Sequence, residues 1–237
     1  MNLIDVGIIC VFVLFVLIGW HNGFFVSTLN LACFFLAWLF AVLLSPAVSN
    51  AILSNEGLAD AMLYYTEGAE LVEDVEMRRL PVNQLSSDTL SEILEDANLP
   101  SPLDTLVAQN MAGEVFAEDD ITTVGDYFNQ TIVNFTVNVL AFLIVFLLVR
   151  IVLAFVVHGV DYTIKLPMLQ HFDAPLGAGF GLVRGFFALF VVFMVLPTFI
   201  VLIEPAFPSI RAYIDDSFLG PFFYNSNFLL SFVRGVV

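Results

Sequence analysis

The sequence comprises 237 residues, of which 59% are apolar and 13% are charged, and its formal net charge at pH 7 is −16. Because soluble domains carry about 25% charged residues, and because residues 6–55 contain no Asp, Glu, Lys or Arg, this composition excludes a water-soluble globular protein. The acidic balance also excludes a nucleic-acid-binding protein. We therefore expect an all-α integral membrane protein that is embedded in the lipid bilayer.

Four stretches are apolar over the roughly 20 residues that a helix needs to cross about 30 Å of bilayer hydrocarbon. They lie at about residues 3–20, 24–44 (extending toward 53), 132–157 and 176–203. Because only His21-Asn22-Gly23 joins the first two stretches, we expect residues 1–53 to form a tight transmembrane hairpin. Residues 129–203 are expected to form a second hairpin.

Residues 54–128, between the two hairpins, hold 17 of the 23 acidic residues and form an insert of different character. Apolar residues recur at helical spacing in the middle of this insert, at Leu90, Ile93, Leu94 and Ala97. Ser87 or Asp88 can cap that helix. We expect three or four short amphipathic helices, which rest partly on each other and partly on the membrane.

Residues 204–237 form a tail that mixes aromatic residues, prolines and charges. Such a segment is typical of the membrane interface, where aromatic rings are half buried. We expect this tail to be amphipathic and interfacial.

The distribution of Lys and Arg sets the expected orientation, because basic residues favour the cytoplasmic side. Arg150, Lys165 and Arg184 lie toward the side of the 21–23 turn and the 158–175 connection, whereas Arg211 lies toward the other side. We therefore expect the turn and this connection to be cytoplasmic. The acidic insert and both termini are then extracytoplasmic.

Two seven-residue segments, GWHNGFF at 19–25 and GLVRGFF at 181–187, share the pattern Gly-x-x-x-Gly-Phe-Phe. They are either one structural unit used twice or a coincidence in a Phe-rich chain. Glycines four residues apart lie on one face of a helix and allow another backbone to approach closely. Five glycines are therefore candidates for helix packing: Gly19, Gly23, Gly177, Gly181 and Gly185.

Asp5, Arg150 and Arg184 are the charged residues inside or beside the expected spans, where a charge costs about 2.5–3.5 kcal/mol on insertion scales. Asp5 is either an interfacial carboxylate exposed to water or part of a proton or cation path. Arg184 either extends to the cytoplasmic surface or pairs with Asp161 or Asp173. Because Arg150 lies at a similar depth, the two arginines together can hold anionic lipid head groups.

The uncharged polar residues within the spans form two pairs, Ser27 with Asn30 and Asn134 with Asn138. They lie at opposite expected depths, so we expect them to serve helix packing rather than one shared site. The sequence contains no signature of a catalytic site, a metal site or a cofactor site. We therefore expect a protein that is not an enzyme and needs no cofactor.

Three segments together resemble the colicin V production protein (CvpA) family. They are NLIDV at 2–6, GWHNGF at 19–24 and LGAGFGLVRG at 176–185. Asn22 stands where the family carries an Arg in its first turn. The resemblance implies a multi-pass protein of the bacterial inner or plasma membrane, linked to the production of a secreted peptide toxin and to envelope homeostasis.

Two functions follow as hypotheses. The first is a non-enzymatic CvpA-like factor that supports toxin production or export through self-association or through partner membrane proteins. The alternative is a subunit of a small oligomeric channel or transporter. Four helices with few buried polar groups make a poor pore alone, so the alternative requires several copies.

Overall fold

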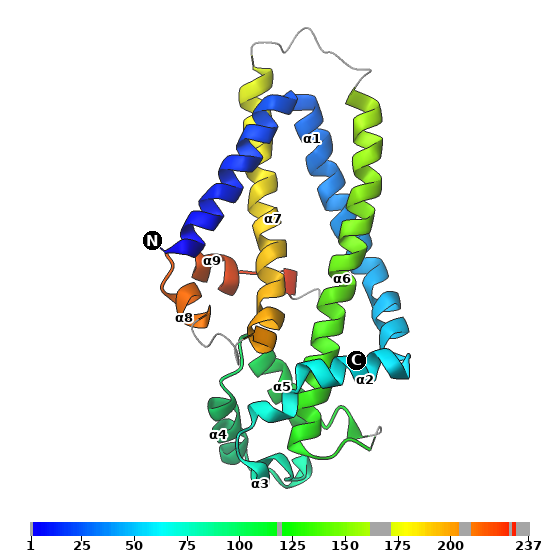
Figure 1. Cartoon of the computed structure of the whole chain (residues 1–237), viewed down its shortest axis with the longest axis vertical. Coiled ribbons are helices and arrows are strands. Elements are labelled where there is room, and N and C mark those ends of the chain that lie inside the picture. The colour runs from blue at the N-terminus through cyan, green and yellow to red at the C-terminus, as the bar shows by residue number, and fades with distance from the viewer. Residues whose placement is uncertain (1, 118–119, 162–171, 204–209, 228, 231–237) are drawn as a thin grey trace. The chain divides into compact units, whose positions relative to one another are not determined.

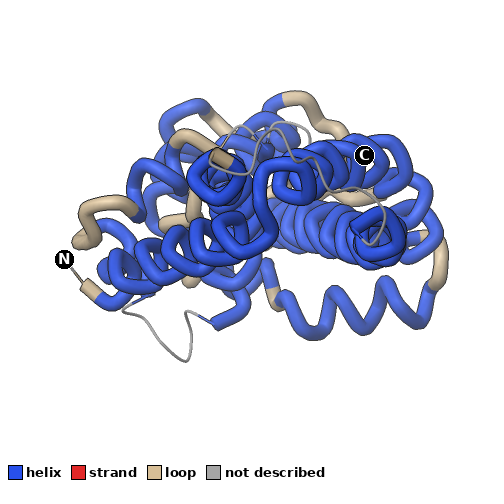
Figure 2. The backbone as a smooth tube through the Cα atoms, turned by 90° about the horizontal axis from the view of Figure 1, so that it is seen from above, coloured by secondary structure: helices blue, strands red, loops and turns tan. Residues whose placement is uncertain are grey.

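The computed structural model describes residues 2–117, 120–161, 172–203, 210–227 and 229–230, and the described residues are helices joined by loops, without a strand (Figure 2). The helices, in chain order, are α1 (Leu3–Leu53), α2 (Glu56–Thr66), η1 (Gly68–Leu71), α3 (Val75–Arg78), η2 (Val82–Gln84), α4 (Ser87–Ala97), α5 (Leu103–Ala112), α6 (Val124–Asp161), α7 (Asp173–Ile203), α8 (Ile210–Asp215) and α9 (Gly220–Asn225).

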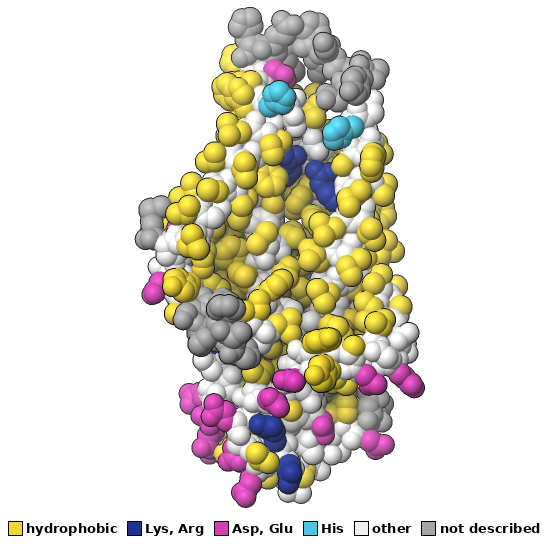
Figure 3. Space-filling model, in the orientation of Figure 1, with side chains coloured by type: hydrophobic (Ala, Val, Ile, Leu, Met, Phe, Trp, Pro, Cys, Tyr) yellow, Lys and Arg dark blue, Asp and Glu magenta, His cyan; other side chains and the backbone are white. Residues whose placement is uncertain are grey.

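Three of these helices, α1, α6 and α7, are long and apolar enough to cross a membrane. They expose large apolar side chains that would be costly in water, such as Leu17, Leu43 and Phe155. In Figure 3 such side chains, in yellow, cover these helices. Together with their length, this surface identifies a multi-pass membrane protein.

The chain divides into two compact units. Unit 1 comprises Met1–Ser45, Ala141–Met194 and Ser209–Leu229, and unit 2 comprises Pro46–Leu140, Val195–Pro208 and Leu230–Val237.

In unit 1, α1 bends at Gly23, which has a left-handed φ of 76° with ψ of 178°. Only glycine adopts such a backbone conformation without strain. The residues on both sides stay helical, so the expected turn of three residues is a single glycine. The two limbs of α1 diverge from this kink as an inverted V (Figure 1), rather than packing along their length as a tight hairpin.

In unit 2, the acidic segment folds into α2 to α5, and side chains cap the starts of α2, α3 and α4. The side chains of Asn55, Asp74 and Ser86 accept hydrogen bonds from the first backbone N–H groups of α2, α3 and α4. The cap of α4 is therefore Ser86, one residue before the expected candidates. Magenta carboxylates cluster over this segment in Figure 3, while Ile93, Leu103 and Val107 are buried.

Helix α6 begins eight residues before the expected start at Ile132. Its first turns contain polar residues such as Asp126 and Gln130, which made the sequence resemble a loop. In the structure, these turns belong to the core of unit 2. Tyr127 is buried against the ring of Phe116, with 5.3 Å between centroids, and its hydroxyl oxygen accepts a hydrogen bond from the Phe116 N–H.

Candidate functional site

The first limb of α1 and helix α7 meet backbone to backbone at glycines in unit 1. A Cβ placed on Gly19 would collide with the carbonyl group of Gly177, and a Cβ on Gly177 would collide with the carbonyl groups of Gly19 and Gly23. A Cβ on Gly181 would collide with the carbonyl oxygen of Phe15. Four of the five glycines singled out in the sequence therefore lie at one crossing, which leaves no room for a side chain.

The kink beside this crossing is held by a carboxylate. Because Gly23 leaves the helical conformation, the helix of the second limb starts anew, and the N–H of Phe24 donates a hydrogen bond to Asp173 Oδ1 at 2.8 Å. Asp173 also lies in the first turn of α7, where a negative charge is favourable. The hydroxyl of Ser27 donates to the Gly19 carbonyl oxygen at 3.2 Å and ties the second limb back to the first.

Phe15 lies in a notch on α7 that the glycine spacing creates. Gly181 leaves space for its backbone, and Gly185 lies against its side chain. Between these two glycines in the sequence, Arg184 places its guanidinium carbon 4.9 Å from the centroid of the Phe15 ring. This is cation–π geometry, and the side chain of Arg184 is only 6% exposed.

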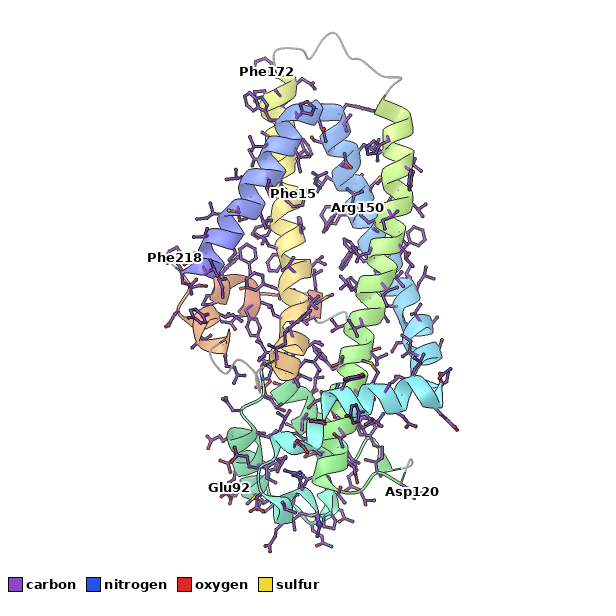
Figure 4. All side chains as sticks on the ribbon, in the orientation of Figure 1. Phe15, Glu92, Asp120, Arg150, Phe172 and Phe218 are labelled. Atoms are coloured by element: carbon purple, nitrogen blue, oxygen red, sulfur yellow. The ribbon has the colours of Figure 1, made fainter. Side chains whose placement is uncertain are left out.

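A second arginine of unit 1 approaches from α6. Arg150 Nη2 donates a hydrogen bond to Asn30 Oδ1 on the second limb of α1 at 3.2 Å (Figure 4). Asn30 is held in turn, because its Nδ2 donates to the Val26 carbonyl oxygen at 3.0 Å. Arg150 and Arg184 each lie eleven residues from one end of their helix, which is Asp161 for α6 and Asp173 for α7.

This arginine pair, Arg150 and Arg184, keeps unused donors in buried positions. Arg150 Nη1 and Arg184 Nε are buried and have no hydrogen-bond partner. Neither of the expected pairings of Arg184 is present in the described part of the chain. Asp173 lies eleven residues away on the same helix, about 16 Å along its axis, and the side chain of Asp161 lies outside the described residues.

The structure contradicts one of the two interpretations of Asp5, that of an interfacial carboxylate exposed to water. Its carboxylate is fully buried, not exposed to water. It accepts hydrogen bonds from the backbone N–H groups of Asn2, Phe218 and Leu219, at 2.9–3.1 Å. Asp5 thus joins the start of α1 to the segment that leads into α9.

The tail is partly buried in unit 1. Phe223 of α9 is 2% exposed and lies against the rings of Phe12 on α1 and of Phe186, Phe190 and Phe193 on α7. Phe218 is 81% exposed (Figure 4). An aromatic composition alone did not distinguish the ring that enters the core from the ring that faces outward.

The second polar pair, Asn134 and Asn138, lies in unit 2. Asn134 is buried and its Oδ1 accepts a hydrogen bond from Gln130 Nε2 on the same helix at 3.1 Å. Asn138 lies one turn further along α6 and is half buried. Within the described residues, no group of three His, Cys, Asp or Glu side chains could hold a metal ion.

Sequence reasoning missed Phe15 and the role of Asp173. Phe15 is one of 26 phenylalanines, and nothing in its local sequence marks it. Asp173 did carry a signal, because an acidic residue followed by Ala-Pro is typical of a helix start.

Comparison with known proteins gives one result. Residues 110–236, just over half of the chain, match the sequence model of the family described as Colicin V production protein. No curated protein and no solved structure matches the chain. The matched range contains Arg150, Arg184 and the glycines of α7, whereas Asp5 and the first limb of α1 precede it.

The glycine crossing predicts a position-specific response to one added methyl group. Gly181→Ala should lower the Tm of the full-length protein in mild detergent by about 2–10 °C, because relieving such a clash costs about 1–3 kcal/mol. Gly179→Ala is the matched control, since a Cβ there meets nothing within 4 Å. Equal Tm values for the two variants would show that the crossing is not close-packed.

The buried carboxylate predicts that the tail depends on Asp5. Asp5→Ala should accelerate chymotrypsin cleavage at the aromatic residues around α9, because the N–H groups of Phe218 and Leu219 lose their acceptor. Asp216→Ala removes an exposed carboxylate nearby and should leave the cleavage rate unchanged. Cleavage of Asp5→Ala at the wild-type rate would contradict a clamping role.

Proposed function

Because the chain belongs to the Colicin V production protein family, we propose that it is a CvpA-like protein of the bacterial inner membrane that supports the production or export of a colicin V-type toxin and envelope homeostasis. The family match is the observation that carries this proposal. The role is non-enzymatic and is exerted through helix association, either with further copies of the chain or with partner membrane proteins.

The packing of unit 1 supports such a role. Its close contacts join backbones at Gly19, Gly177 and Gly181. Glycine faces of this kind are typical of membrane helices that associate with other helices. A protein built on them is suited to hold neighbouring helices in a defined arrangement.

The membrane topology that we propose has four crossings. The first limb of α1, residues 3–22, extends about 30 Å and is long enough to cross alone. The second limb, α6 and α7 provide the other three crossings. Residues 1–53 and 129–203 are then the two hairpins, and the positive-inside rule puts the kink at Gly23 in the cytoplasm.

Under this topology, residues 54–128, the tail at 204–237 and both chain ends are extracytoplasmic. In a variant without Cys10 and Cys33, Ser87→Cys should react on intact cells with a membrane-impermeant thiol reagent, because Ser87 is exposed on the insert. His21→Cys, beside the kink, should react only after the cells are opened. The reverse pattern would invert the proposed orientation.

The proposed role predicts a loss of secreted toxin. Deleting the gene in a strain that produces a colicin V-type peptide should shrink the zone of growth inhibition on a sensitive lawn, and the wild-type gene should restore it. Gly181→Ala should restore it poorly and Gly179→Ala fully, since only the former disturbs the crossing. A zone unaffected by deletion would refute the role in toxin production.

A channel or transporter subunit is the second candidate. Arg184, buried within an apolar span, favours it, because intramembrane charges often line ion or substrate paths. Purified protein in liposomes should then conduct anions above the level of empty vesicles, and Arg184→Gln should reduce that current. Toxin loss on deletion without any conductance would support the scaffolding role over the channel.

A further inference from the structure

The arginine pair of unit 1 keeps hydrogen-bond donors that have no partner in the described chain. Arg184 is 6% exposed and stacks on Phe15, and its Nε has no hydrogen-bond partner. Arg150 donates from Nη2 to Asn30, and its Nη1 is buried without a partner. Like charges in apolar surroundings are unfavourable unless an anion joins them.

Four carboxylates of unit 1 have described side chains, whereas the side chain of Asp161 at the end of α6 lies outside the described residues. Asp5 accepts backbone hydrogen bonds at the start of α1, and Asp173 accepts one from Phe24 at the kink. Asp215 and Asp216 are exposed at the end of α8. None of these four side chains forms an ion pair with Arg150 or Arg184 within the described residues.

The surroundings hold both guanidinium groups in place. Phe15 supports Arg184 from one side, and the glycines on either side of Arg184 fix α7 against the first limb of α1. Asn30 orients Arg150 from the second limb. Both arginines lie eleven residues from the ends of their helices on the side of the kink, so their charges lie at matching depth.

We propose that Arg150 and Arg184 form a binding site for a phosphate group within the membrane-spanning part of unit 1. Guanidinium groups present planar sets of N–H donors that match the oxygens of phosphate, and they remain charged at every physiological pH. The phosphate comes either from an anionic phospholipid head group or from free inorganic phosphate. In the first case a zwitterionic lipid binds less well, because its cationic group meets two positive charges.

Arg184 is buried, so a ligand would reach the site from the side of Arg150, which Figure 4 labels on α6. Figure 3 shows dark-blue basic side chains within the yellow apolar field of the helices. Arg150 is half buried. An acyl chain can therefore stay in the bilayer while its head group reaches the arginine pair.

The chain has a net charge of −16 and as a whole repels anions. A preference for an anionic lipid would therefore indicate a local basic site. Full-length protein in mild detergent, offered phosphatidylglycerol or phosphatidylcholine, should retain the anionic lipid preferentially in native mass spectrometry. Arg150→Gln and Arg184→Gln should each reduce that retention about fivefold, the contribution of one basic residue to binding an anionic membrane surface. Arg79→Gln removes an exposed charge from the insert and is the matched control.

A second arm identifies the source of the phosphate. Inorganic phosphate, added to lipid-free protein, should raise the Tm of wild type but not of Arg184→Gln if the ligand is free phosphate, and should have no effect if only the lipid binds. Either result supports the site. It is overturned if wild type prefers neither phosphatidylglycerol nor phosphate, or if Arg79→Gln loses as much lipid as Arg184→Gln. The wild-type measurements decide even if a variant fails to fold.

Discussion

The contact between the backbones of Gly19 on α1 and Gly177 on α7 is the constraint on which unit 1 depends. It brings the first limb of α1 so close to α7 that Phe15 enters the notch between Gly181 and Gly185. It also places the start of α7 beside the kink, where Asp173 accepts the Phe24 N–H. Without a side chain between them, the two backbones gain dispersion contacts that a lipid-filled gap would not provide.

This crossing explains why the two Gly-x-x-x-Gly segments occur in one chain without requiring that they be duplicates. The segments at 19–25 and 181–187 contribute to the same contact from opposite sides. The spacing of these glycines alone predicted that they serve helix packing. It did not indicate their partner. A glycine indicates that another backbone can approach closely, but it does not indicate which helix approaches. The two limbs of α1 diverge because the first limb packs on α7 instead of on the second limb.

The water-exposed interpretation of Asp5 was wrong because the partners of Asp5 lie far away in the sequence. Its carboxylate is buried and accepts hydrogen bonds from N–H groups more than 200 residues away. Every residue except proline carries a backbone N–H, so the sequence does not indicate which N–H groups will bind a buried carboxylate. The early start of α6 was missed for a different reason. Tyr127 is buried against Phe116 of the insert rather than within a continuous apolar run.

Packing and charge are coupled in α7 because Arg184 lies between two glycines of the crossing. A larger residue at Gly181 or Gly185 would push Phe15 away and remove the aromatic face on which the guanidinium rests. Conversely, the tight crossing excludes water that would otherwise hydrate the charge, so the cost of burying Arg184 rises as the helices approach. An anion bound by Arg150 and Arg184 would offset that cost. The family match covers α6 and α7 but not the first limb of α1. The first limb lies directly against Gly177 and Gly181, which belong to the matched part. Helix α7 therefore leaves no room for a side chain at Gly19 of that limb.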